Sequence, residues 1–134
     1  DGWLIRTYPD IAALKPLPTP APGPDWPRVF PIRWTLIEED NPGWETPWEL
    51  DPAALQSINA SENDSQRHND FPRCYTTKVG GWPTYIQGAP DLPAKDFVLQ
   101  IASEEKPQWN LWDSGTIYIY CSPEGKWQMH LDFF

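Results

Sequence analysis

Apolar and polar residues alternate along three stretches in the last third of the chain, at residues 96–102, 116–121 and 126–134. The apolar members are Phe97, Leu99 and Ile101, then Ile117, Ile119 and Cys121, then Trp127, Met129, Leu131 and Phe133. A period of two residues is typical of a β-strand with one buried face. We therefore expect three strands whose apolar residues lie in the core, with Tyr118 and Tyr120 on the opposite face and His130 and Asp132 on a solvated one.

A turn joins the last two of these strands. Ser122-Pro123-Glu124-Gly125 has proline early and glycine last, which is a β-turn pattern. Cys121 and Lys126 flank this turn, so the chain is expected to end in a β-hairpin.

The first half of the chain gives weaker patterns. Ile32, Trp34 and Leu36 alternate within 29–38, which predicts an edge strand or a bulged strand with these three residues in the core. Cys74–Val79 predicts another strand. Asp51 followed by Pro52 is a favourable helix start, so a short helix is expected over Pro52–Ala60.

These elements predict a single domain over residues 1–134 with an α+β, β-rich fold. It would be mainly an antiparallel sheet with a C-terminal hairpin and one or two short helices. Proline-rich loops are also expected, because five prolines recur at every second residue between Pro16 and Pro24.

A corner precedes the last three strands at Gly80-Gly81-Trp82-Pro83, and Gln87 closes the short apolar run behind it. Adjacent glycines allow a sharp turn or a close backbone approach. Proline after Trp82 favours extended backbone geometry at that tryptophan. We interpret the corner as a packing element that sets out the C-terminal sheet, with a ligand-binding corner as the alternative.

Composition narrows the possible partners. The 134 residues carry a formal net charge of −9. This argues against nucleic acid and anionic membranes, both of which need clustered cations. It permits a basic protein partner. There is no run of 18 or more apolar residues and only two cysteines, which favours a cytoplasmic protein without a disulfide framework.

Catalytic and metal-binding patterns are weak. The histidines and cysteines lack the spacing of a zinc site, so we expect no metal, no cofactor and no catalytic residue. The alternative is an enzyme that uses Asp113, His130 and Asp132. A further alternative is a carbohydrate-binding module in which Trp44, Trp48 or Trp109 forms an aromatic platform.

An acidic segment without lysine or arginine runs from Glu38 to Asp51 and contains two tryptophans. Carboxylates accelerate association with a basic surface, and tryptophan is a favoured interface anchor. We therefore expect a protein partner to bind this segment, with a solvated loop whose tryptophans fold inward as the alternative. The expected partner-binding residues are Glu38, Glu39, Asp40, Trp44, Glu45, Trp48 and Glu49.

Three blocks together resemble a known family. They are Lys78-Val79-Gly80-Gly81-Trp82-Pro83 with Ile86-Gln87, Phe97-Val98-Leu99-Gln100-Ile101, and Trp112-Asp113-Ser114-Gly115 with Ile117-Tyr118. Their order and spacing are similar to the C-terminal half of the YwqG-like bacterial family, a domain of unknown function. The signature residues of the resemblance are Gly80, Gly81, Trp82, Pro83, Gln87, Asp113 and Gly115. One position departs, since Trp112 stands where the family usually has glycine.

The resemblance implies a mixed, β-rich fold without known catalytic residues. Some family members are encoded beside bacterial toxins and look like immunity proteins. Together with the acidic segment, this predicts a non-catalytic protein that neutralises a basic toxin or effector domain by direct binding.

Overall fold

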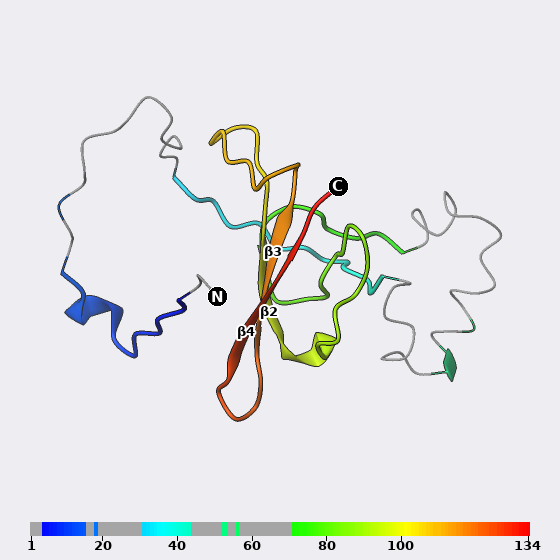
Figure 1. Cartoon of the computed structure of the whole chain (residues 1–134), viewed down its shortest axis with the longest axis horizontal. Coiled ribbons are helices and arrows are strands. Elements are labelled where there is room, and N and C mark those ends of the chain that lie inside the picture. The colour runs from blue at the N-terminus through cyan, green and yellow to red at the C-terminus, as the bar shows by residue number, and fades with distance from the viewer. Residues whose placement is uncertain (1–3, 16–17, 19–30, 44–51, 54–55, 57–70) are drawn as a thin grey trace.

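A four-stranded antiparallel sheet forms the centre of the computed structural model (Figure 1). The structure describes residues 4–15, 18, 31–43, 52–53, 56 and 71–134. The strands are β1 (Lys78–Val79), β2 (Phe97–Ala102), β3 (Thr116–Cys121) and β4 (Trp127–Asp132), in the order β1-β2-β3-β4. Short 3-10 turns are η1 (Ile11–Ala13) and η3 (Ala94–Asp96).

The three longer strands confirm the strands predicted from the alternation in the sequence. They are rich in β-branched and aromatic residues, which suit a pleated surface. The expected hairpin is also present, with Cys121 opposite Trp127. Gly125 closes its turn at φ +79° and donates its N–H to the Ser122 carbonyl at 2.8 Å. A three-residue hairpin loop commonly consists of a tight turn followed by a residue with a left-handed backbone. Glycine adopts that backbone without steric cost.

The first half differs from the expected strands and helix. Only Lys78 and Val79 of the Cys74–Val79 stretch form a strand, and residues 31–37 form none. Of the predicted helix over 52–60, the structure describes residues 52, 53 and 56, which are helical. Almost no helix is therefore present in the described part of the chain, and the fold is β-rich. The proline-rich stretch lies almost entirely outside the described residues.

The expected buried face of the sheet was wrong. Tyr118 and Tyr120 are 0% and 1% exposed, whereas Trp127 on the apolar face is 37% exposed. Most of the apolar set on β2, β3 and β4 is only half-buried, with Phe97 and Ile117 as the buried exceptions. The face that carries tyrosine, glutamine and aspartate is the one that a long loop covers.

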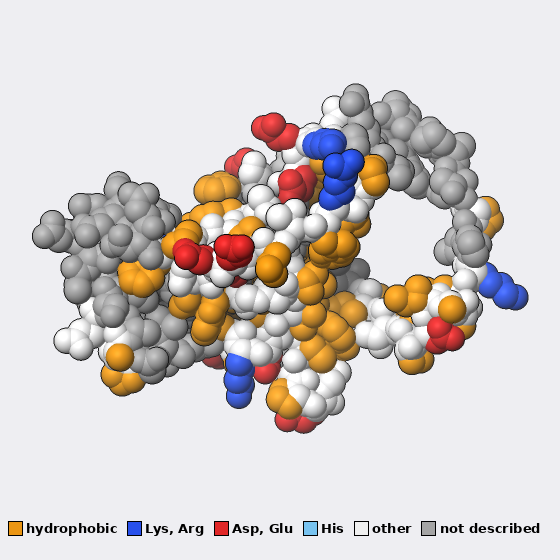
Figure 2. All heavy atoms as spheres, turned by 180° about the vertical axis from the view of Figure 1, so that it is seen from behind, with side chains coloured by type: hydrophobic (Ala, Val, Ile, Leu, Met, Phe, Trp, Pro, Cys, Tyr) orange, Lys and Arg blue, Asp and Glu red, His pale blue; other side chains and the backbone are white. Residues whose placement is uncertain are grey.

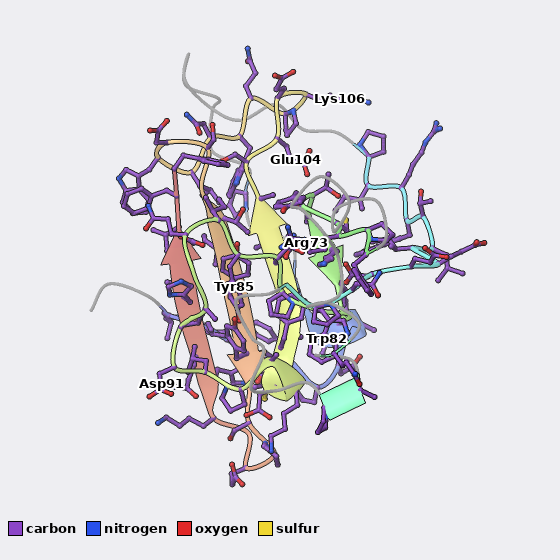
Figure 3. The ribbon with its side chains drawn as sticks, turned by 90° about the vertical axis from the view of Figure 1, so that its right-hand side faces the viewer. Arg73, Trp82, Tyr85, Asp91, Glu104 and Lys106 are labelled. Atoms are coloured by element: carbon purple, nitrogen blue, oxygen red, sulfur yellow. The ribbon has the colours of Figure 1, made fainter. Side chains whose placement is uncertain are left out.

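That loop is residues 80–93, and it crosses the sheet from Trp82 beside β1 to Asp91 beside β4 (Figure 3). Tyr85 packs against Tyr118 with ring centroids 5.0 Å apart, and Phe97 and Tyr120 complete the core cluster. Phe97 joins this face because a register irregularity between Phe97 and Leu99 interrupts the alternation of β2. A bulge of this kind redirects a side chain.

Side chains of the sheet supply hydrogen bonds that the loop backbone lacks. Gln100 accepts from Thr84 N at 3.1 Å and donates to the carbonyls of Cys74 and Thr76 at 3.0 and 2.7 Å. The Tyr118 hydroxyl donates to the Thr84 carbonyl at 2.6 Å. Loop backbone groups that would otherwise be buried without partners are thereby satisfied.

Replacing Gln100 by leucine should destabilise the protein by roughly 2 kcal/mol, because the Thr84 N–H and the Thr76 carbonyl lose their partner, whereas the Cys74 carbonyl keeps the Thr84 hydroxyl. Urea unfolding followed by tryptophan fluorescence measures the change. Gln87→Leu is the matched control, because Gln87 is exposed and only its backbone N–H is used. Equal stability of the two variants would contradict the role assigned to Gln100.

Candidate functional site

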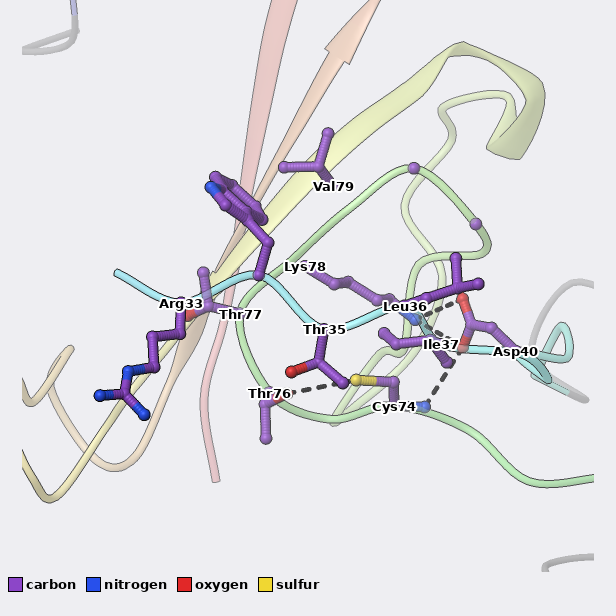
Figure 4. A pocket seen from close by; sticks show the side chains of 13 residues that line it. Arg33, Thr35, Leu36, Ile37, Asp40, Cys74, Thr76, Thr77, Lys78 and Val79 are labelled. Atoms are coloured by element: carbon purple, nitrogen blue, oxygen red, sulfur yellow. Dashed lines mark hydrogen bonds and ion pairs between the residues drawn. The ribbon is translucent and has the colours of Figure 1, made fainter. Parts of the chain in front are cut away.

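A cavity of about 390 Å³ lies between the extended segment 31–37 and strand β1 (Figure 4). Its two walls come from parts of the chain that are far apart in sequence. Its floor contains Asp40, Cys74 and Lys78, and the Gly80–Gly81 turn closes one end. We call this cavity the β1 groove.

The outer wall of the β1 groove is unusually apolar for a surface segment. Ile32, Trp34 and Leu36 are 78%, 77% and 84% exposed. The expectation that this alternating set lies in the core was therefore wrong. Within the described residues no backbone–backbone hydrogen bond is made by residues 31–39, and the first one in this segment is made by Asn41, whose N–H donates to the Pro72 carbonyl at 3.1 Å. The segment is thus presented at the surface rather than folded inward.

An ion pair forms the floor of the groove. Lys78 Nζ lies 2.7 and 2.8 Å from the two Asp40 carboxylate oxygens and donates to Thr84 Oγ1 at 3.0 Å. The Lys78 and Asp40 side chains are only 2% and 10% exposed. Burial lowers the pKa of Lys78 below 10.5, and the adjacent Asp40 carboxylate partly opposes that shift. The pair joins segment 31–43 to the sheet.

Asp40 has two further internal partners. Its oxygens accept the backbone N–H groups of Cys74 at 3.2 Å and Trp82 at 2.9 Å. Gly81 packs against the same carboxylate, and a side chain at Gly81 would collide with it. Asp40, expected in a partner interface, thus holds the fold together, whereas Glu38 and Glu39 are exposed. The remaining expected contacts, Trp44, Glu45, Trp48 and Glu49, lie outside the described residues.

The signature glycines occupy positions that require glycine. Gly80 and Gly81 have φ values of +71° and +73°, which L side chains rarely adopt. A side chain on Gly115 would lie 2.7 Å from the carbonyl oxygens of Asp132 and Leu111. Trp112, where the resembled family usually has glycine, has φ +53°. A left-handed backbone therefore persists there despite the bulky side chain.

Of the remaining signature residues, Trp82, Pro83 and Gln87 lie in the loop over the sheet, and Asp113 lies at the turn before β3. Pro83 is buried and Trp82 is half-buried beside the Asp40 carboxylate. The N–H groups of Ile86 and Gln87 both donate to Asp132 Oδ2, at 2.6 and 2.9 Å. Asp113 is exposed at the turn before β3, where its carbonyl accepts the Phe134 N–H at 3.2 Å.

The three residues of the enzyme alternative have separate surroundings. Asp132 is 3% exposed and its carboxylate receives two loop amides, so the expectation of a solvated face was wrong there. His130 stacks on Tyr118 with centroids 5.8 Å apart, and its buried Nε2 has no hydrogen-bond partner in the described part of the chain. Asp113 is exposed. Within the described residues no group of three or more His, Cys, Asp or Glu side chains could hold a metal ion.

In the sequence, Lys78 and Gln100 stand out only as members of the blocks that resemble the family, and no role was predicted for them. A cation and an amide inside otherwise apolar strand patterns were the available signals, because such groups are buried only with partners. Thr84 and Cys74, which share hydrogen bonds with these two residues, gave no signal in the sequence. Trp109, named in the alternative of a sugar-binding platform, partly lines a second, open cavity of about 500 Å³ at the 103–114 loop.

The fold and the groove define a small β-rich protein with an antiparallel sheet and a surface cavity beside its first strand. Residues 29–129 match the family described as Domain of unknown function (DUF1963), and the chain belongs to that family. No curated protein and no solved structure gives a significant match. Among the described residues, no helix is long and apolar enough to cross a membrane.

Breaking the ion pair should be costly. Lys78→Met leaves the buried Asp40 carboxylate without its cation, and the free energy of unfolding should fall by about 3–5 kcal/mol. Denaturant unfolding measures this loss, with Lys95→Met as the control because Lys95 is exposed.

The double variant Lys78→Met/Asp40→Leu removes both charges and should recover part of the loss. It keeps the test valid if the single variant does not fold. A single variant as stable as Lys95→Met would refute the structural role of the pair.

Histidine 130 should make stability depend on pH. Burial lowers the pKa of His130 below 6.5, and Asp132 partly opposes the shift. The folded state thus prefers neutral His130, so stability is full above 6.5 and falls as pH drops from there toward the folded pKa. His130→Phe should lose less stability than the parent between about pH 7.5 and pH 5.5. Equal losses in chemical unfolding at the two pH values would refute this, since His68 is common to both proteins.

Proposed function

We propose that this protein acts by binding another protein, and most specifically that it is an immunity protein that neutralises a basic bacterial toxin or effector domain in the cytoplasm. The observation that supports this proposal is the exposure of Ile32, Trp34 and Leu36 along one surface segment. Large apolar side chains grouped at a surface are typical of a protein-interaction site.

Charge supports a basic partner. Glu38 and Glu39 are exposed directly after the apolar residues of the segment, and the whole chain carries a net charge of −9. Opposite charges on two partners raise the association rate and fix their relative orientation. An apolar patch bordered by carboxylates therefore suits a basic surface that also offers an apolar contact.

The exposed tryptophan supports tight binding rather than transient contact. Trp34 can bury a large area with few rotatable bonds, and tryptophan is enriched among residues that dominate binding energy. Blocking an enzyme requires long-lived binding, and slow dissociation comes mainly from such buried anchors. The resemblance to a family with toxin-linked members also supports a role in blocking a toxin.

Reversing the two exposed charges should slow association. Glu38→Lys/Glu39→Lys should reduce the association rate with a basic partner about tenfold at low salt, with a smaller effect at high salt. The partner to use is the purified product of a neighbouring gene, and surface plasmon resonance gives both rates.

Glu105→Lys/Glu124→Lys is the matched control, because it makes the same change in net charge at exposed sites on other loops. Equal slowing by the two double variants would contradict a localised contact surface. Failure of every neighbouring gene product to bind at low salt would contradict the immunity proposal.

A further inference from the structure

Strand β1 has a free edge that faces the β1 groove. β1 ends the sheet order, and β2 is its only strand partner among the residues that the structure describes. Val79 lies opposite Leu99, and the next residue, Gly80, donates its N–H to the Val98 carbonyl at 2.7 Å. In an antiparallel ladder, hydrogen-bonded pairs alternate with non-bonded pairs. The N–H and C=O of Val79 therefore point away from β2.

No other backbone in the described part of the chain takes up these two groups. Segment 31–37 runs beside β1 on the far side of the groove, but no backbone hydrogen bond joins it to β1 (Figure 4). The space between them is the cavity of about 390 Å³. An unpaired strand edge at an open cavity is suited to accept another strand.

Both walls of the groove offer apolar contacts to such a strand. Trp34 and Leu36 line the outer wall, and Val79 on the inner wall is 60% exposed. Apolar side chains at the surface are visible on the face seen from behind (Figure 2). Side chains of an added strand alternate in direction, so its apolar residues can meet these walls.

Charge sets a polarity along the groove. Arg33 and Thr77 both line the groove, and the close view draws Arg33 at the end away from Asp40 (Figure 4). Glu38 and Glu39 follow the apolar residues toward the other end, where Asp40 contacts the Trp82 N–H. A cation on the incoming chain is therefore favoured at the Gly81 end and disfavoured at the Arg33 end.

We infer that the β1 groove binds an extended segment of the protein partner, which adds to the sheet as a strand antiparallel to β1 and exchanges two backbone hydrogen bonds with Val79. The partner segment alternates apolar and polar residues and carries basic residues at its amino end, which lies nearest Glu38 and Glu39. This inference rests on the proposed protein-binding function and specifies its mode.

The buried floor makes the groove a preformed site. Lys78 and Asp40 fix the base of the outer wall to β1, and Gln100 fixes the backbone just before it through the Thr76 carbonyl. Binding to a fixed edge avoids part of the ordering cost of association. The glycine turn leaves open space beside Gly80, because no atom of the described residues beyond its chain neighbours lies within 4 Å of where its side chain would be.

Amide hydrogen exchange at Val79 tests the inference. The probe is a capped peptide of alternating valine and threonine with two lysines at its amino end. At saturation, exchange at the Val79 amide should slow about tenfold or more. The amide of Gly80 is an internal control, because it already donates to Val98 in the free protein.

A second peptide of the same sequence, N-methylated at alternate residues along one edge, should bind at least about tenfold more weakly, since it cannot complete the ladder. Equal binding of the two peptides would refute strand addition. Slow exchange at Val79 without any peptide would also refute it, because the edge would then be paired already.

The two proposals fail in different ways. Peptide-induced shifts at Trp34 and Leu36 without protection of Val79 would refute strand addition but retain a protein-binding surface. A peptide that causes no shift at either wall of the groove would refute strand addition. If a neighbouring gene product still bound the protein, the proposed protein-binding function would stand. Val79→Pro provides the matching variant, because proline has no N–H to donate to an added strand, and in a folded protein it should weaken peptide binding at least about tenfold.

Discussion

Everything in this fold depends on how the backbone of residues 80–93 finds hydrogen bonds while lying on a sheet. The loop has no regular structure except for a turn, yet part of it is buried. Buried backbone groups need partners, and here side chains from β2, β3 and β4 provide them. Gln100, Tyr118 and Asp132 each reach loop backbone directly, and Lys78 reaches the Thr84 hydroxyl. The polar residues of the sheet are therefore structural.

This constraint explains why alternation in the sequence gives the strands but assigns the wrong buried face. Periodicity locates β2, β3, β4 and their hairpin, because a period of two belongs to any half-buried strand. It cannot tell which face a loop will cover. Tyrosine has a large apolar ring and a hydroxyl that reaches a partner, so Tyr118 and Tyr120 are buried more fully than the isoleucine at position 119.

Short sequence motifs predicted the structure correctly where the backbone conformation of a single residue determines it. The glycines at 80, 81 and 125 have left-handed backbones, and glycine in a turn pattern predicts this without tertiary information. The segment 31–37 shows the reverse case. Its alternation is as regular as that of β3, but a strand forms only when another edge pairs with it. Contacts between residues that are distant in sequence, such as Asp40 and Lys78, could not be predicted for the same reason.

The Lys78–Asp40 pair also links the fold to the candidate function. Charges taken out of water are stable only with close partners, so Asp40 must stay against β1 and the Trp82 amide. Residues 31–37 come before Asp40 in the chain and run along the edge of β1. The chain is thus fixed at one end of the groove while its apolar side chains remain uncovered. A wall held in this way keeps the edge of β1 open, and the free backbone groups of Val79 lie where the exposed apolar residues are gathered.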